Sequence, residues 1–194
     1  SRFAERIMIY MGSFKAETFD ELFDGVKSLP WESFIGRDDA FPVKGWSINS
    51  KLHSVPGCQS IIKKAVVDRL KSIYGISWFK ESGAAYRISF SIMKNTASLY
   101  IDTSGEGLHK RGYRPKSNAA PIKETLAAAM ASLTGIFDDS QVYDPFCGSG
   151  TILIESAMIA ANIAPGAKRR FAAESFNQID LSVWKSEREK ENGL

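Results

Sequence analysis

The chain has 194 residues, of which 44% are hydrophobic and 24% charged, so it can form one or two soluble domains with a sizeable core. The 25 Lys and Arg residues exceed the 22 Asp and Glu residues by only three, and this mild excess does not by itself demonstrate nucleic-acid binding. Two cysteines, Cys58 and Cys147, argue against a disulfide framework, and no apolar run is long enough to span a membrane, so we expect a cytoplasmic protein.

The first part of the chain predicts two helices before any strand. The opening apolar residues share one helical face: Phe3, Ile7, Tyr10 and Met11. Residues 18–21, Thr-Phe-Asp-Glu, form a capping box that predicts a helix over 19–29, and Pro30 closes it. Because these helices have no sheet to cover, we expect strands N-terminal to Ser1 in the full protein.

The middle of the chain predicts a small α+β unit. Residues 41–54 mix apolar and polar side chains as an extended segment would. Residues 59–74 predict a helix, because apolar residues repeat on one face and Gly75 follows as a stop. Apolar and polar residues then alternate over 86–92 and again at 99–101, around a short turn at 94–96, which predicts a β-hairpin.

Two short basic runs are candidates for phosphate contacts. One occupies residues 109–116, where Lys and Arg surround Tyr113, and the other is Lys-Arg-Arg at 168–170. A solvated loop, or a linker that packs against acidic neighbours, is an equally good interpretation of each run.

The last part of the chain predicts a strand between two helices. Residues 121–134 are rich in alanine and carry apolar residues at helical spacing. Residues 141–143 predict the first strand of a second sheet. The apolar run 152–163 predicts another helix, so residues 143–151 lie where a strand would lead into a helix.

These nine residues, Tyr-Asp-Pro-Phe-Cys-Gly-Ser-Gly-Thr, are expected to form a turn that binds a small ligand. Gly148 and Gly150 can take backbone angles closed to other residues, and the start of the helix favours an anionic group. A dinucleotide fingerprint is disfavoured because Leu153 stands where it needs glycine, and a P-loop is excluded because no lysine follows Gly150. The simpler alternative is a turn that only connects two elements.

Neither metal binding nor covalent catalysis is predicted. His53 and Cys58 are too few to supply the ligands of a structural metal site. Cys147 lies inside the glycine turn with no histidine near it in the sequence, which favours packing against a ligand over action as a nucleophile.

The Asp-Pro-Phe-Cys-Gly-Ser-Gly-Thr block resembles motif I of Rossmann-like S-adenosylmethionine methyltransferases of the amino-methylating branch. Residues 49–64 resemble a THUMP domain, an RNA-binding module of RNA-modifying enzymes. Residues 108–114 and 120–129 are similar to the join between THUMP and methyltransferase domains. Together these segments resemble bacterial ribosomal RNA guanine-N2 methyltransferases, a group often labelled N6-adenine-specific DNA methylases.

The resemblance implies an α+β THUMP-containing region followed by the start of an α/β Rossmann-like methyltransferase domain. The expected parts are a partial N-terminal α+β subdomain (1–35), the THUMP domain (36–105), a basic linker (106–119) and the N-terminal part of the methyltransferase domain (120–194). S-adenosyl-L-methionine is the implied cofactor, and its expected contacts are Asp144, Pro145, Phe146, Cys147, Gly148, Ser149, Gly150 and Thr151, with Thr125 and Glu124 as weaker candidates. RNA, most simply large-subunit ribosomal RNA, is the implied partner, and its expected contacts are Lys63, Lys64, Lys110, Arg111, Arg114 and Lys116.

The expected enzyme is incomplete in this sequence. Methyltransferases of this kind also need an acidic residue for the cofactor ribose and an Asn- or Asp-Pro-Pro-Tyr loop for the target amine, and the sequence contains no Pro-Pro pair. We therefore expect a truncated, inactive fragment of an enzyme that methylates an exocyclic amine, most simply guanine N2. The alternatives are an N6-adenine DNA methylase and a non-catalytic RNA-binding protein with a vestigial methyltransferase domain.

Overall fold

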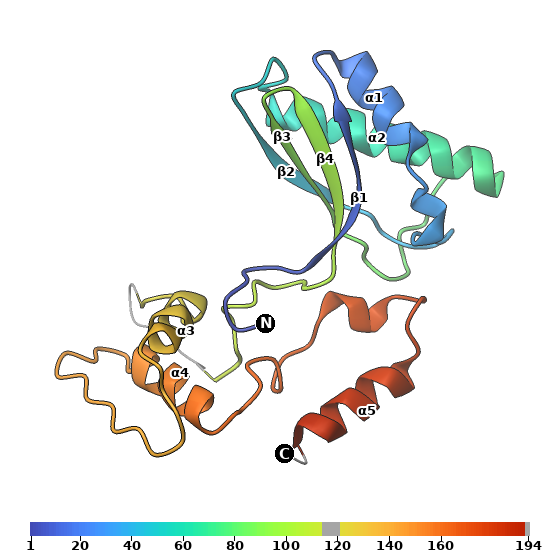
Figure 1. Ribbon diagram of the computed structural model, residues 1–194. Coiled ribbons are helices and arrows are strands. Elements are labelled where there is room, and N and C mark those ends of the chain that lie inside the picture. The colour runs from blue at the N-terminus through green and yellow to red at the C-terminus, as the bar shows by residue number, and fades with distance from the viewer. Residues whose placement is uncertain (114–120, 193–194) are drawn as a thin grey trace. The chain divides into compact units, whose positions relative to one another are not determined.

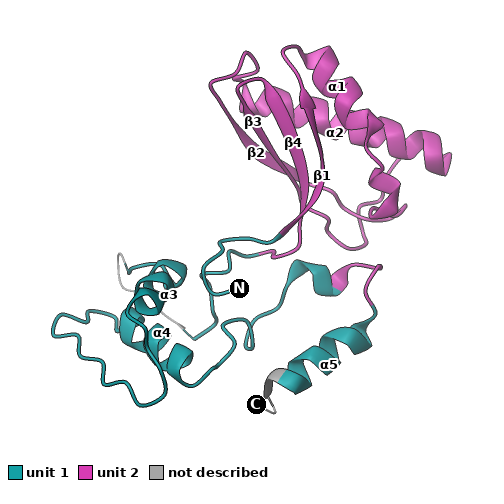
Figure 2. Ribbon diagram, in the orientation of Figure 1, with its two compact units in different colours: residues 1–7, 106–174, 180–194 teal, residues 8–105, 175–179 magenta. Residues whose placement is uncertain are grey.

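The computed structural model describes residues 1–113 and 121–192, and the chain divides into two compact units (Figure 2). The sheet unit consists of Met8–Gly105 and Ser175–Ile179. The helical unit consists of Ser1–Ile7, Glu106–Glu174 and Asp180–Leu194. Neither unit is one continuous stretch of sequence, because the chain passes between them four times, after residues 7, 105, 174 and 179.

A four-stranded mixed sheet forms the centre of the sheet unit (Figure 1). Its strands are β1 (Met8–Lys15), β2 (Val43–Ile48), β3 (Ile88–Met93) and β4 (Thr96–Asp102), in the spatial order β1-β4-β3-β2. β4 is antiparallel to both β1 and β3, whereas β2 runs parallel to β3. The sheet therefore joins the first strand of the unit to the last.

The predicted hairpin is confirmed as β3 and β4. Its turn contains Lys94 and Asn95, whose φ angles are 50° and 61°. Two consecutive residues in the left-handed region are typical of the two-residue turns that match the twist of paired strands. Met93 then lies opposite Thr96 in the first register position of the pair.

The Thr18 cap predicted at the start of α1 (Phe19–Ser28) is confirmed, and the Glu21 side chain also reaches back along the chain. The hydroxyl of Thr18 accepts a hydrogen bond from the backbone N–H of Glu21 at 3.2 Å. The Glu21 carboxylate in turn accepts one from the backbone N–H of Glu17 at 2.7 Å. The first bond satisfies an amide group that the helix leaves without a partner, and the second fixes the residue before the N-cap, one position earlier than in a standard capping box. A short 3-10 turn, η1 (Trp31–Ser33), follows the helix.

The helix predicted over residues 59–74, α2 (Val55–Tyr74), begins earlier than expected and ends where expected. The Ser54 hydroxyl caps its start by accepting from the Gly57 N–H at 3.3 Å. Gly75 ends it with φ 64°, the left-handed conformation in which glycine is favoured. α1 and α2 contribute to the apolar core of the sheet unit with β3 and β4, and their fully buried side chains include Leu22, Val26, Ile62, Val66, Leu70, Ile88, Ile92, Leu99 and Ile101.

The helix predicted at the N-terminus is wrong. Residues 8–15 form β1 instead, with Met8 opposite Asp102 and Lys15 opposite Thr96. The partner strand lies far downstream in the sequence, so local periodicity could not reveal the pairing. The expectation that these helices lack a sheet is also wrong, since β1 and α1 belong to the sheet unit. The predicted domain boundary between residues 35 and 36 stays a prediction.

A segment from the far end of the chain, residues 175–179, completes the sheet unit. The Phe176 ring stacks on the Tyr86 ring, with centroids 4.2 Å apart and planes inclined by 19°. The Tyr86 hydroxyl accepts a hydrogen bond from the Asn177 N–H at 3.0 Å and donates one to the Gln178 side-chain oxygen at 3.1 Å. Both rings are buried, so this segment is part of the core.

The helical unit contains α3 (Glu124–Leu133), α4 (Thr151–Ala160) and α5 (Leu181–Asn192). It also contains most of the short 3-10 turn η2 (Ala172–Ser175), whose last residue belongs to the sheet unit. Both helices predicted around the glycine turn are thereby confirmed. The strand predicted at residues 141–143 does not form, because no described segment pairs with it. No described helix has the length and apolarity needed to cross a membrane.

Candidate functional site

The predicted ligand turn at residues 144–150 leads directly into α4. Its side chains are mostly exposed, and Phe146 reaches 93% exposure. The Asp144 carboxylate accepts a hydrogen bond from the Phe146 N–H at 3.1 Å, which folds the start of the turn. The Gly150 N–H then donates to the Cys147 carbonyl at 2.8 Å and closes it. The turn thus has its own backbone structure and an accessible surface.

Both glycines of the turn occupy the left-handed region, with φ 54° at Gly148 and 69° at Gly150. A Cβ atom at Gly150 would meet nothing within 4 Å, and one at Gly148 only the Phe146 carbonyl at 3.9 Å. Glycine is therefore needed here for its backbone angles, while the space beside the turn stays open. Gly150 is the N-cap of the ten-residue α4 and supplies no side-chain acceptor. The positive end of the helix dipole can consequently act on an anionic group.

The two weaker cofactor candidates lie at the start of α3 and are buried. Thr125 donates a hydrogen bond from its hydroxyl to the Glu5 carboxylate at 2.7 Å. The other oxygen of that carboxylate lies 2.9 Å from His109 Nδ1. The hydrogen bond from Thr125 is the main cause that holds the pKa of Glu5 below its ordinary value. Thr125 thus positions the N-terminal segment, and cofactor contacts by Thr125 and Glu124 stay a prediction.

The basic run at 109–116 has a buried member, Arg111. Its guanidinium donates to the Leu108 carbonyl at 2.8 Å, and its Nε lies 3.4 Å from an oxygen of Glu155 on α4. The Tyr113 hydroxyl donates to the same Glu155 oxygen at 2.8 Å. The side chains of Arg111 and Glu155 are only 2% and 0% exposed. The interpretation of a linker packed against an acidic neighbour therefore describes Arg111, which has no free surface for an RNA phosphate.

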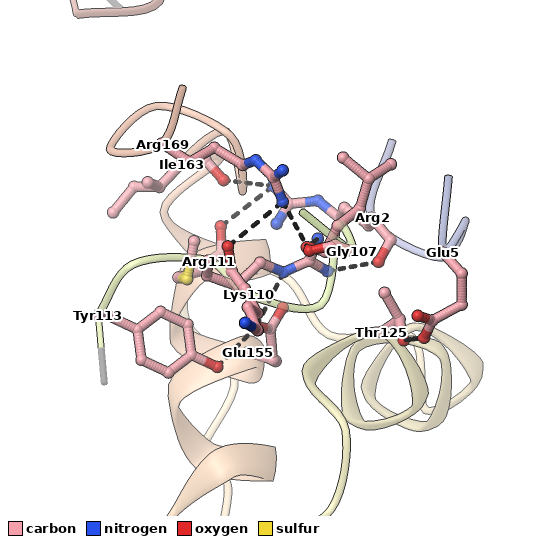
Figure 3. A network of polar contacts seen from close by, with 12 residues as sticks. Arg2, Glu5, Gly107, Lys110, Arg111, Tyr113, Thr125, Glu155, Ile163 and Arg169 are labelled. Carbon is pink, nitrogen blue, oxygen red and sulfur yellow. Dashed lines mark hydrogen bonds and ion pairs between the residues drawn. The ribbon is translucent and has the colours of Figure 1, made fainter. Parts of the chain in front are cut away.

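Arg2 and Arg111 lie close to each other above α4 (Figure 3). Arg111 donates to the backbone carbonyl of Arg2. The Arg2 guanidinium donates to the carbonyls of Ile163 at 2.8 Å and Met158 at 3.3 Å, at the C-terminal end of α4. A cation is favourable at that end of a helix. Burial lowers the pKa of Arg2, and the charge of Glu155 opposes that effect.

The second basic run also has a buried member, Arg169. It donates to the carbonyls of Gly107 at 2.8 Å and Lys110 at 3.3 Å (Figure 3). It also donates to the Glu106 carbonyl at 2.7 Å. The middle arginine of the run at 168–170 thereby ties it to the loop that carries the first run. The side chains of Lys168 and Arg170 remain exposed on either side.

The two basic runs line one cavity of about 750 Å³ in the helical unit. Residues 106 and 109–112 form one part of its wall, residues 121–124 another, and residues 168–170 a third. The spacing of these segments in the sequence could not predict that they line one cavity, because they come together only on folding. None of the turn residues 144–150 lines this cavity.

The other predicted RNA contacts lie elsewhere or cannot be placed. Lys63 and Lys64 are on α2 in the sheet unit, where Lys63 lies 3.6 Å above the Phe41 ring and Lys64 lies 5.7 Å from the Phe23 ring. Lys63 also pairs with Glu81. Arg114 and Lys116 lie outside the described residues.

The two cysteines differ in environment. Cys58 is buried, and burial raises the pKa of its thiol. Cys147 is exposed in the glycine turn. Among residues 1–113 and 121–192, no three His, Cys, Asp or Glu side chains gather as metal ligands would.

Two family models match adjoining parts of the chain. Residues 16–102 match the THUMP domain. Residues 111–193 match the RMKL-like methyltransferase domain, and this match contains the glycine turn, α3 and α4.

Two curated relatives align over almost the whole chain. A Bacillus subtilis (strain 168) protein named "Putative RNA methyltransferase YpsC" is 50% identical over 189 residues, which are 96% of this chain and 49% of that protein. A Psychromonas ingrahamii protein (strain DSM 17664 / CCUG 51855 / 37) named "Ribosomal RNA large subunit methyltransferase K/L" is 35% identical over 188 residues, which are 96% of this chain and 25% of that protein. The chain thus spans half or less of these relatives.

Two solved structures have the same fold over 99% of this chain. One is described as "a predicted N6-adenine-specific DNA methylase from Listeria monocytogenes str. 4b F2365", with 50% identity, a TM-score of 0.94 and 51% of that chain covered. The other is described as "SMU.472, a putative methyltransferase complexed with SAH", with 42% identity, a TM-score of 0.92 and 52% of that chain covered.

Proposed function

Because the chain joins a THUMP domain to an RMKL-like methyltransferase domain, we propose that the protein carrying it is an S-adenosylmethionine-dependent methyltransferase of RNA. The observation that carries the proposal is the turn at 144–150. It lies inside the methyltransferase match, has two left-handed glycines, and opens a helix with no side-chain cap. A turn that merely connected two elements would not need this combination.

The residues of the turn fit the cofactor on chemical grounds. The amide groups at the start of α4 suit a carboxylate such as that of the methionine moiety, and the open space beside Gly150 allows close approach to the backbone. The half-buried Asp144 carboxylate can accept hydrogen bonds from an ammonium group. S-adenosylmethionine would supply an electrophilic methyl group on its sulfonium. A solved relative described as complexed with SAH supports this assignment.

The proposed substrate is an exocyclic amine of a base in large-subunit ribosomal RNA, with guanine N2 as the specific target. The relative named as a large-subunit ribosomal RNA methyltransferase and the THUMP match support RNA. The description of the Listeria structure favours N6-adenine in DNA as the second candidate. In either case the target base must leave its stack before it can meet the cofactor, and holding the two in register supplies much of the acceleration.

We further propose that methyl transfer needs segments outside this chain. The sequence contains no Pro-Pro pair for the loop that would hold the target amine. The chain also spans only half or less of the relatives that it matches. The described residues would then provide cofactor and RNA contacts rather than the complete catalytic site.

The decisive experiment compares substrates with the full-length protein. Radiolabelled S-adenosylmethionine is incubated with protein-free large-subunit ribosomal RNA or with naked duplex DNA, and the modified nucleoside is identified by mass spectrometry. We expect N2-methylguanosine from the RNA, no transfer to the DNA, and no transfer by residues 1–194 alone. N6-methyladenine in the DNA would favour the second candidate. Calorimetry that detects no S-adenosylhomocysteine binding would overturn the enzyme assignment and favour a non-catalytic RNA-binding protein.

A further inference from the structure

The cavity between the two basic runs, here called the basic cavity, concentrates positive charge. Six Lys and Arg residues and two Glu residues line it, an excess of four positive charges without His109. The whole chain has a net charge of only +3. The rest of the chain is therefore close to neutral, and the net positive charge of the chain is concentrated in the lining of the basic cavity.

Within the part of the chain that the structure describes, two of the six cations have no bound partner to displace. Lys168 and Arg170 are exposed, and neither side chain makes a hydrogen bond or ion pair within the described residues. Lys110 makes only a surface ion pair with Glu106 at 2.9 Å, in which the two side chains are 58% and 69% exposed. Such pairs contribute little to stability and exchange readily for another anion. The basic cavity thus presents at least three cationic groups to a ligand.

The backbone that carries these cations is held in place. Arg169, between Lys168 and Arg170, is anchored by its bonds to the carbonyls of the 106–110 loop. Gly112 has φ 90°, and a Cβ there would lie 3.3 Å from the Lys168 carbonyl, so the two loops approach closely at that point. The arrangement is therefore built by buried contacts.

We propose that the basic cavity binds the phosphodiester backbone of the RNA substrate, through Lys168, Arg170 and Lys110. Separate cations suit a polyanion better than the single carboxylate of the cofactor, and the turn proposed for the cofactor lies outside the cavity wall. A volume of about 750 Å³ is within the usual range of small-ligand sites, so one nucleotide fits. This inference rests on the proposed function and names the residues that serve it, replacing Arg111 with Lys168 and Arg170.

The test measures how RNA binding depends on salt. The full-length protein and its Lys168→Ala/Arg170→Ala variant are titrated into fluorescently labelled poly(U) RNA over a series of KCl concentrations. Each phosphate contact contributes about 0.7 to the slope of log K against log salt for single strands, so the variant should have a slope smaller by about 1.4. A matched control is Lys185→Ala/Lys190→Ala, which removes the same charge from exposed positions on α5 that do not line the basic cavity.

The outcomes distinguish a failure of this inference from a failure of the proposed function. If the cavity variant has the wild-type slope while wild-type protein binds both poly(U) and S-adenosylhomocysteine, the basic cavity is not the phosphate site and the proposed function stands. If calorimetry shows that the cavity variant loses S-adenosylhomocysteine affinity instead, the basic cavity serves the cofactor and the inference is wrong. If wild-type protein binds S-adenosylhomocysteine but not poly(U), both this inference and the RNA assignment fall. An equal loss of slope in the α5 control would overturn the inference about the basic cavity, because the effect would then follow net charge alone.

Discussion

Arg111 and Glu155, 44 residues apart in the chain, form an ion pair that is almost completely buried. The contact joins the loop of the first basic run to α4, and Tyr113 supports it by donating to the same carboxylate oxygen. Removing two charges from water is costly, and their attraction offsets that cost only while both are present. The pair therefore makes the position of the loop dependent on α4.

Substitution of either partner alone should destabilise the helical unit. Arg111→Met leaves the Glu155 carboxylate buried without its ion-pair partner, and we expect a loss of about 3–5 kcal/mol in the free energy of unfolding. The double substitution Arg111→Met/Glu155→Met should recover a large part of that loss. Urea unfolding measures both values. Lys110→Met, at an exposed position, serves as the control and should change stability by less than about 0.5 kcal/mol. An unchanged free energy of unfolding in Arg111→Met would contradict the stabilising role of the buried pair.

The basic runs show what sequence can and cannot resolve. Local composition identified two candidate phosphate-binding loops, but it could not tell which cations face solvent. That distinction depends on Glu155 and on the carbonyls of residues 106, 107 and 110, which come close only after folding. Glu155, a charged residue inside the apolar run 152–163, is the sequence signal that α4 packs against a cation.

The fold was predictable where its determinants are local. The Thr18 cap of α1, the Gly75 stop of α2 and the hairpin turn at 94–96 all depend on neighbouring residues, and all are confirmed. β1 depends on pairing with β4 across most of the sheet unit, so its apolar spacing was mistaken for a helix. The strand predicted at 141–143 failed for the related reason that a strand needs a neighbour.

Glycine substitutions separate backbone strain from ligand binding in the turn. Gly150→Ala forces a side chain into the left-handed region, which costs about 1–2 kcal/mol, and it also places a methyl group in the open space beside the turn. Gly135→Ala is a matched control, because Gly135 has φ 68° and a Cβ added there would also meet nothing within 4 Å. We expect similar losses of stability in urea. Only Gly150→Ala should weaken S-adenosylhomocysteine binding in calorimetry, and equal affinities would remove Gly150 from the cofactor site.

The stack of Phe176 on Tyr86 makes the sheet unit depend on a segment from the end of the chain. Phe176→Ala removes a buried aromatic ring, and we expect a loss of about 3–5 kcal/mol in the stability of the sheet unit. Tyr86→Phe keeps the stack but loses the hydroxyl contacts with Asn177 and Gln178, so its cost should be smaller. Phe137→Ala, at a residue 63% exposed, is the control. Hydrogen exchange of β3 and β4 amides reports the effect, and unchanged protection in Phe176→Ala would show that the segment is dispensable.

Glu5 should make the helical unit less stable in acid. Its pKa lies below the ordinary value, first because Thr125 donates to it and then because His109 and Lys123 are near. A carboxyl whose pKa is depressed on folding adds stability above its unfolded pKa of about 4.3, and that contribution is lost as the pH falls through the folded value. The wild-type protein should therefore lose more stability than Glu5→Gln between about pH 5 and pH 3.

Two variants identify the source of this pH dependence. Thr125→Val removes the hydrogen bond that contributes most, so the pKa of Glu5, followed by NMR of its carboxyl carbon, should rise toward its ordinary value. The pH dependence of stability is measured by urea unfolding of wild type and Glu5→Gln at each pH. Repeating these measurements in a His109→Gln background separates the contribution of the Glu5 carboxylate from that of the imidazole that contacts it. Because Glu5 is 47% exposed, the effect should be small and should shrink at high salt. Parallel stability curves for wild type and Glu5→Gln from about pH 5 down to pH 3 would exclude Glu5 as a source of acid sensitivity.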